Sequence, residues 1–411
     1  MEPMKSKWSK WKEKLYGLFE RIKDKLSLLK KKVGIIDESE PISFDVAEFM
    51  SDTQQALEKL PKDYREKCEI KAIQDKHNFL FREEEMEKIE KCLEHWKEKR
   101  FVTAALVGEK GSGISSLVNI FLENHPELTI LRTEIDDKIS EQEKCLEWLS
   151  SLLQKPLQNT EMAIQTLQDD FEGKVIVIEN LQHLFLKKVG GFEGIRTLFD
   201  IIASTGKQVF WIGALTPSSW NYLDKTVSIS NYFTTDISLN DIKADELRQL
   251  FLSKHKGYKL KIKPTKEIAK DKSFKKMSDK EQQEFLEEQF FYMLNSLSHG
   301  NLTLAQLYWV RAISTVENHE VQLADISKIE TDFLENLNPE QLFSLQQMLI
   351  HDGLNIEDFA SVTNQPLLVC RNTLIPMREK GLLIQPSEKY TINPVLYQPV
   401  YQLLKDKNFI H

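Results

Sequence analysis

The residues best suited to chemistry lie in the glycine-rich run GEKGSGISS, which begins at Gly108 and directly follows the apolar run FVTAALV. Glycines let successive backbone N–H groups curve around a phosphate, and the first turn of a following helix adds positive potential. The pattern G-x-x-x-x-G-K-[ST] describes such a phosphate loop. The candidate phosphate-binding residues are therefore Gly108, Lys110, Gly111, Ser112, Gly113, Ser115 and Ser116.

One position of this loop departs from the pattern. Ile114 stands where the pattern requires the lysine that neutralises the β- and γ-phosphates. Isoleucine offers neither charge nor a hydrogen bond, whereas the backbone donors remain. We therefore expect weak binding of ATP or ADP at most, with Lys110 as an alternative source of positive charge.

Two further candidates follow later apolar runs. The run VIVI ends in Glu179 and Asn180, where a phosphate-loop ATPase ends a strand in Asp-Glu. Glu179 could hold Mg²⁺ through water, so the sequence leaves open whether the site binds a metal. Asn180 cannot act as a general base, because an amide has no useful proton affinity. Thr216, at the end of the run QVFWIGAL, is the last candidate nucleotide-binding residue.

These residues need a scaffold of parallel strands. The runs FVTAALVG, LTILRTEI, KVIVIEN and QVFWIGAL are short, apolar and separated by helical stretches. This alternation predicts an α/β fold with a parallel sheet covered on both faces. After Asn240 the pattern becomes helical, with a solvated Lys- and Glu-rich excursion over residues 262–289 and a buried helix over 297–313. In residues 336–411 the pattern predicts three helices and two strands, an order typical of a winged helix.

The expected domain organisation has five parts. They are a basic amphipathic helix and linker (1–40), a helical connector (41–78), a phosphate-loop core (79–240), a helical lid (241–335) and a winged helix (336–411).

Composition is that of an ordinary globular protein, with 41% hydrophobic and 29% charged residues and a net charge of -8. No apolar run approaches the ~20 residues that cross a bilayer, and the first residues lack the apolar core of a secretory signal. The scattered thiols indicate a reducing compartment, so we expect a cytoplasmic location. These thiols are Cys68, Cys92, Cys145 and Cys370.

The first 33 residues carry eleven Lys or Arg and four acids. Within residues 4–33 the apolar positions recur at intervals of three and four, which is helical spacing. A basic amphipathic helix with Trp8 and Trp11 could lie on the inner face of a membrane. The alternative is that it docks on a protein partner or on the rest of this protein, and the sequence leaves these interpretations open.

Taken in order, these motifs resemble the AAA+ superfamily, on the branch that contains STAND signalling ATPases and archaeal origin-recognition initiators. FREEEMEKI, residues 81–89, resembles the segment that introduces the nucleotide pocket. FWIGALTPSSW resembles the strand and loop of sensor 1, with Thr216 at its polar tip, and HGNLTLAQLYWVRAI resembles the sensor-2 helix. The resemblance covers about residues 79–400 and rests on the order of motifs.

The resemblance implies roles that several positions cannot perform. Thr303 stands where an arginine often begins the sensor-2 helix, and no arginine occurs between Arg196 and Arg248, where an arginine finger is expected. Such a finger is worth about 10³–10⁵ in rate for related phosphoryl transfer. Together with Ile114 and Asn180, these departures predict a pseudo-ATPase.

We therefore expect a non-catalytic regulatory or scaffolding subunit that acts through protein–protein contacts with a protein partner or a homologous ATPase subunit. A nucleotide switch without turnover and a winged-helix DNA-binding initiator are the alternatives. The expected recognition helix, residues 366–380, offers only Arg371, Arg378 and Lys380 as cations, and residues 336–411 sum to a net charge of -1. DNA-binding modules usually show a clear basic face, so this count argues against DNA.

Overall fold

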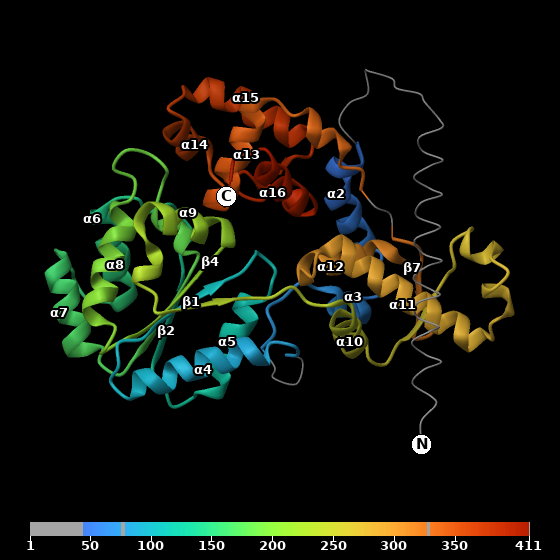
Figure 1. Cartoon of the computed structure of the whole chain (residues 1–411), viewed down its shortest axis with the longest axis horizontal. Coiled ribbons are helices and arrows are strands. Elements are labelled where there is room, and N and C mark those ends of the chain that lie inside the picture. The colour runs from blue at the N-terminus through green and yellow to red at the C-terminus, as the bar shows by residue number, and fades with distance from the viewer. Residues whose placement is uncertain (1–43, 75–78, 327–328, 411) are drawn as a thin grey trace. The chain divides into compact units, whose positions relative to one another are not determined.

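The computed structural model describes residues 44–74, 79–326 and 329–410 (Figure 1). These residues belong to one unit, 43–411. The predicted amphipathic helix of residues 4–33 lies outside the described residues, so it stays a prediction.

A five-stranded parallel sheet forms the centre of the α/β core. Its strand order is β2-β3-β4-β1-β5, and every neighbouring pair is parallel. Their carboxyl ends therefore meet at one edge of the sheet, where ligands of α/β proteins bind. The strands are β1 (Thr103–Val107), β2 (Ile130–Glu134), β3 (Val175–Glu179), β4 (Phe210–Leu215) and β5 (Thr235–Ser238).

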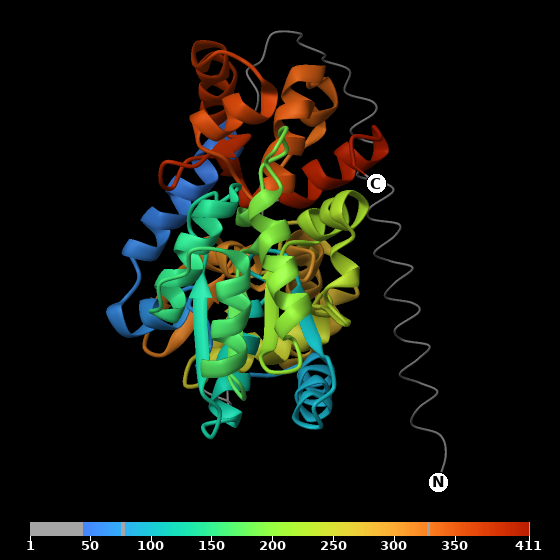
Figure 2. The same ribbon diagram turned by 90° about the vertical axis from the view of Figure 1, so that its left-hand side faces the viewer.

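Helices cover both faces of this sheet, as the alternating sequence predicts (Figure 2). Successive side chains of β1 point to opposite faces, so Ala104 and Leu106 pack with one helical layer, and Ala105 and Val107 with the other. The first layer contains α4 (Glu83–Lys97) and α5 (Ile114–Asn124). The second contains α6 (Gln142–Leu153), α7 (Thr160–Asp170), α8 (Glu193–Thr205) and α9 (Pro217–Val227). The predicted three-layer α/β fold is confirmed.

The lid that follows the core combines helices with a small sheet. Its helices are α10 (Ala244–Lys254), α11 (Asp279–Ser298) and α12 (Leu302–Ala312). To the predicted helical lid the structure adds a three-stranded sheet, which the sequence analysis did not foresee: β6 (Lys259–Ile262), β7 (Ile313–Glu317) and β8 (Glu320–Leu323). The excursion predicted over residues 262–289 is solvated only in part, since Leu286 is buried on α11.

The C-terminal module has three helices followed by a short antiparallel strand pair, the element order expected of a winged helix. The elements are α13 (Pro339–His351), α14 (Ile356–Thr363), α15 (Leu367–Glu379), β9 (Leu383–Ile384) and β10 (Thr391–Ile392), and a further helix α16 (Tyr397–Asp406) follows.

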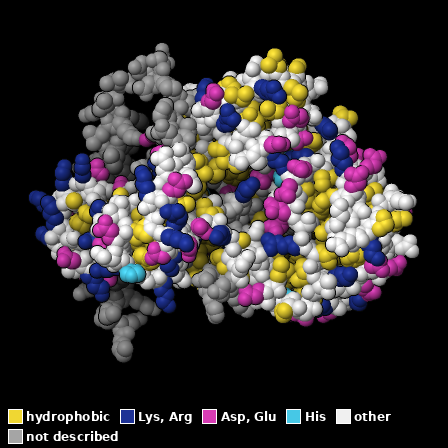
Figure 3. Space-filling model, turned by 180° about the vertical axis from the view of Figure 1, so that it is seen from behind, with side chains coloured by type: hydrophobic (Ala, Val, Ile, Leu, Met, Phe, Trp, Pro, Cys, Tyr) yellow, Lys and Arg dark blue, Asp and Glu magenta, His cyan; other side chains and the backbone are white. Residues whose placement is uncertain are grey.

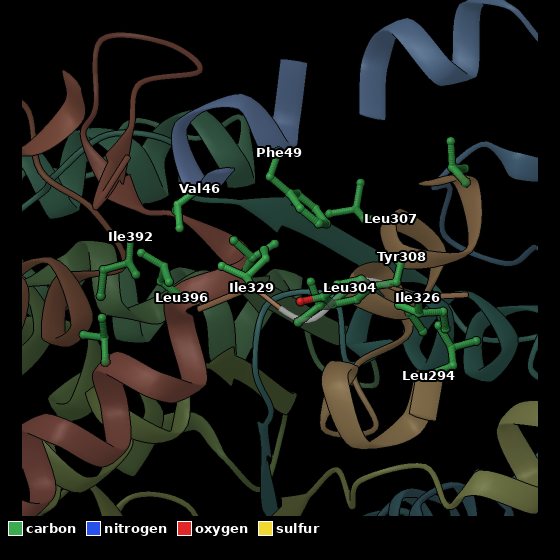
Figure 4. Close-up of a cluster of buried hydrophobic side chains, with 14 of the residues drawn as sticks. Val46, Phe49, Leu294, Leu304, Leu307, Tyr308, Ile326, Ile329, Ile392 and Leu396 are labelled. Carbon is green, nitrogen blue, oxygen red and sulfur yellow. The ribbon is translucent and has the colours of Figure 1, made fainter. Parts of the chain in front are cut away.

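One apolar core joins the lid, the C-terminal module and the two helices that precede the α/β core, α2 (Phe44–Glu58) and α3 (Lys62–Cys68). Phe49 of α2 lies edge-to-face against Tyr308 of α12, with ring centroids 5.2 Å apart. Val46 belongs to the same cluster as Leu396 (Figure 4). The early chain therefore helps to build the lid and does not merely connect it.

Candidate functional site

A cavity of about 750 Å³ lies between the carboxyl edge of the sheet and the lid. The phosphate loop, the ends of β3 and β4, helices α10 and α12, and residues 66–74 enclose it. The surface is visibly hollowed near the middle of Figure 3. This volume falls within the range of small-molecule sites, which is roughly 300–1,000 Å³.

The glycine-rich loop has the backbone geometry of a phosphate loop. Gly111 and Gly113 adopt left-handed conformations, with φ of 85° and 103°, and Gly113 caps the N-terminus of α5. Such φ values favour glycine, because a Cβ would clash with its own backbone. A Cβ built on Gly113 meets no atom within 4 Å, so the space beside the first turn of α5 is open.

Most of the predicted site residues come together around this cavity. Glu179 and Thr216 line it with the loop residues Gly108, Lys110, Gly111, Gly113, Ser115 and Ser116. Ser112 is buried instead, and its Oγ is without a hydrogen-bond partner. Lys110 carries a side chain that is 78% exposed, and its Nζ lies 3.9 Å from Asp352 of the C-terminal module.

A buried arginine holds the loop in place. The Arg82 guanidinium donates to Glu85, to the Asn240 carbonyl at 2.6 Å and to the Ser112 carbonyl at 3.0 Å. The side chains of Arg82 and Glu85 are 5% and 4% exposed. The segment before the core therefore anchors the loop through a charge that no solvent screens.

Both hydroxyls at the start of α5 are already engaged. Ser115 Oγ donates to Glu179 Oε2 at 2.6 Å, which joins the loop to the end of β3. Ser116 Oγ accepts the Ile73 backbone N–H at 3.0 Å, and the Asn119 amide donates to the Ile73 carbonyl at 2.8 Å. Residues 66–74 are thus fixed as one wall of the cavity.

Sequence reasoning missed Arg132, which lies on β2 beside the candidate acid. Its Nε and Nη2 approach Glu179 Oε1 at 2.7 and 2.6 Å, so a guanidinium neutralises the carboxylate that was expected to hold Mg²⁺. With Ser115 on the other oxygen, both oxygens of Glu179 are occupied. This donor set does not fit a divalent cation, which requires oxygens free to coordinate it.

A second missed residue is Glu134, the last residue of β2, which also lines the cavity. Asn180 Nδ2 donates to Glu134 Oε1 at 2.8 Å. The neighbouring strand β2 therefore places a carboxylate, Glu134, beside Asn180, the position where the expected catalytic glutamate is missing. The register pairs Glu134 with Glu179, so alignment of the strands was the only signal that could have found it.

The predicted sensor positions serve the structure. Thr216 caps α9, and its Oγ1 lies 2.7 Å from Ser219 Oγ, which in turn donates to the Ile350 carbonyl at 2.7 Å. A Cβ on Gly111 would lie 2.5 Å from Thr303 Oγ1, so the first turn of α12 rests directly on the loop. The Asn301 amide also donates to the Lys110 carbonyl, at 2.9 Å.

The loop carboxylate Glu109 connects the site to the C-terminal module. Gln398 of α16 donates to Glu109 Oε1. Burial, with the nearby charge of Asp241, raises the pKa of Glu109 to about 7. Glu109 therefore titrates near neutral pH at the point where the loop contacts the C-terminal module.

The solved structures that resemble this chain share little of its sequence. No protein-family model matches it, and no curated protein does. Similar solved structures include Cdc6p of Pyrobaculum aerophilum, with a TM-score of 0.44 and 12% identity over 82% of this chain and 97% of that one. ORC1 of Aeropyrum pernix in complex with DNA gives a TM-score of 0.42 and 11% identity over 80% and 95%. Drosophila ORC bound to DNA gives 0.39 and 11% over 94% and 99%.

These likenesses carry no function to this chain. The fold assignment stands on the chain's own topology: a phosphate-type loop between the first strand and its helix, in a five-stranded parallel sheet with the order β2-β3-β4-β1-β5. In the described part of the chain no helix is long and apolar enough to cross a membrane. The same residues contain no group of three or more His, Cys, Asp or Glu placed to hold a metal.

Proposed function

We propose that this chain is a non-catalytic regulatory or scaffolding subunit on an AAA+-like scaffold, acting through protein–protein contacts. The observation that carries the proposal is the phosphate loop itself, whose side chains and carbonyls are bonded to other parts of the chain. Arg82, Asn301 and Gln398 each reach it from a different segment. With Ile114 in the lysine position, the loop is better suited to joining domains than to phosphoryl transfer.

The C-terminal module supports protein contacts over DNA. The first turn of α15, the expected recognition helix, exposes Leu367, Leu368 and Val369 at 44%, 70% and 40%. DNA phosphates are usually met by Lys and Arg at such positions. Of the two arginines on this helix, Arg378 already donates to Gln385 at 2.7 Å. An apolar helix start of this kind is more typical of a protein-binding surface.

The cavity favours a second candidate, a nucleotide switch that binds without turnover. Open space beside Gly113 and the unpaired first-turn N–H groups of a helix suit a phosphate even without the lysine. The apolar residues Ile73, Leu250 and Leu302 line the same cavity and suit a base. Bound nucleotide would contact both the loop and the lid, and could set the angle between them.

A turnover assay tests the non-catalytic proposal. Purified full-length chain is expected to release no phosphate from ATP above the rate of a Gly113→Asp control. Glu134 is the cavity carboxylate best placed to replace the missing base. Steady hydrolysis that is abolished in both Glu134→Gln and Glu179→Gln would overturn the proposal.

Affinity purification with mass spectrometry tests both the scaffolding role and the contribution of the basic residues 1–33. We expect the full chain to capture a homologous ATPase subunit or another stable protein partner. The same experiment without residues 1–33 shows whether the basic segment, outside the described residues, contributes to that capture. Recovery of the full chain and of the shortened chain without any protein partner would contradict a scaffolding role.

A further inference from the structure

Arg132 pairs with Glu179, the carboxylate that the sequence suggested could hold Mg²⁺. We propose that this cavity binds its nucleotide free of Mg²⁺, because the Arg132 guanidinium already neutralises the carboxylate that would recruit the metal. This inference rests on the nucleotide-binding candidate above and concerns the form of the ligand: the metal-free nucleotide anion.

The geometry of Glu179 leaves little for a metal to coordinate. Two guanidinium nitrogens of Arg132 converge on Oε1, at 2.7 and 2.6 Å, and the Ser115 hydroxyl donates to Oε2 at 2.6 Å. The Glu179 side chain is 11% exposed, so water competes weakly for these bonds. Charge-assisted bonds of this kind are among the strongest in proteins.

Arg132 is itself held from a second direction. Its Nη1 donates to Asn119 Oδ1 at 2.5 Å, and the amide of the same Asn119 donates to the Ile73 carbonyl at 2.8 Å. The guanidinium is therefore fixed between β2, β3 and α5. An isolated surface ion pair would be weak, but this one shares a largely buried carboxylate and a network.

The fixed guanidinium changes what the loop can bind. The neutral Arg132–Glu179 pair neither attracts a divalent cation nor repels a phosphate. Phosphate binding then depends on backbone N–H groups and the positive end of α5, which act on any phosphate oxygen. Mg²⁺ bound to the nucleotide would gain no bond to the protein in such a site, so it should not raise the affinity for the nucleotide.

Calorimetry of the full chain with ADP, in excess Mg²⁺ and in EDTA, tests this inference. We expect the wild type to bind ADP more weakly in excess Mg²⁺ than in EDTA, because Mg²⁺ in solution complexes the ADP anion that the site takes. Arg132→Met releases Glu179, and ADP should then bind at least about fivefold more tightly with Mg²⁺ than in EDTA. Arg196→Met, which removes an exposed arginine of α8, should behave as the wild type.

Mn²⁺ alone provides a second measurement, read by electron paramagnetic resonance as loss of the free-ion signal. We expect no bound Mn²⁺ in the wild type and bound Mn²⁺ in Arg132→Met. Tighter binding of ADP in Mg²⁺ than in EDTA, or binding of Mn²⁺, by the wild type would overturn the inference, as would an Arg132→Met chain that gains neither. If no variant binds ADP, the nucleotide-switch candidate fails, and the Mn²⁺ result still decides whether Arg132 blocks a metal.

Discussion

At the scale of single residues, Arg82 contributes more to this site than its distance from the cavity suggests. Its guanidinium bonds to the loop, to the Asn240 carbonyl that follows β5 and to a buried acid. We expect Arg82→Met to lower the free energy of unfolding by about 3–5 kcal/mol, because it leaves the Glu85 carboxylate buried without its partner. Urea denaturation followed by circular dichroism measures this.

An exposed arginine gives the matched control. Arg100 pairs with Glu98, and the two side chains are 63% and 56% exposed. Arg100→Met should therefore change stability by less than about 0.5 kcal/mol. Equal effects of the two substitutions would show that the buried network does not anchor the loop.

Glu109 predicts a pH dependence of stability. Its pKa is raised from 4.5 to about 7 on folding, so between these values the folded chain holds a proton that the unfolded chain has lost. The free energy of unfolding should therefore fall as pH rises from about 4.5 to about 7, by on the order of 2 kcal/mol. Glu109→Gln should remove this component. Unfolding of both chains at about pH 5 and about pH 8 isolates it, and parallel profiles would refute the assignment.

Some of the site could be predicted from residue types and some could not. The loop glycines and Ser115 were found because their spacing follows backbone rules that hold in any α/β fold. Arg132 and Glu134 escaped because their run, LTILRTEI, shows ordinary charged positions on a strand. Only the pairing of β2 with β3 brings them beside Glu179, and strand register is not encoded by local pattern.

At the scale of elements, the contact between the loop and α12 predicts a difference between two glycines. Both have positive φ, so an alanine at either is strained. Only at Gly111 would the new Cβ also meet Thr303 and Asn301, at 2.5 and 2.9 Å. We expect Gly111→Ala to increase hydrogen exchange in α12 by about tenfold over Gly113→Ala, the matched control.

A compensating change sharpens this test. If the clash is the cause, Thr303→Gly in the Gly111→Ala chain should restore part of the protection of α12. Equal exchange in the two single variants would mean that α12 does not rest on the loop in solution.

Element prediction found the strands that form apolar runs and missed the strands that do not. The strands β1, β3 and β4 are buried along their whole length, so their apolar runs were plain. In β5 only Ile237 is buried, because this strand is an edge of the sheet. The lid strand β6 reads as Lys-Leu-Lys-Ile and pairs with β8 about 60 residues later, which a local pattern does not show.

At the scale of the whole molecule, the charge of the C-terminal module predicts its behaviour toward nucleic acid. We expect the chain without residues 1–33, a segment whose eleven Lys or Arg would attract DNA by charge alone, to show no saturable binding to labelled duplex DNA at low salt, measured by fluorescence anisotropy. The exposed start of α15 is apolar, and the C-terminal module offers little positive charge to release counterions. Affinity that falls steeply with salt and is lost in Arg371→Ala with Arg378→Ala would support the initiator-like alternative instead.

The shared core of α2, the lid and the C-terminal module has a consequence for synthesis. The ring of Phe49 packs against Tyr308, and the Asn393 amide donates to the Val46 carbonyl at 3.3 Å. Asn393 is synthesised after nearly the full length of the described chain, so α2 is made long before these partners. A ribosome adds roughly 5–20 residues per second, so α2 stays without its partners for about 15 seconds or more after it emerges. The α/β core, by contrast, is complete once β5 has been made. The α/β core should therefore assemble first, and α2 should pack against the lid and the C-terminal module last.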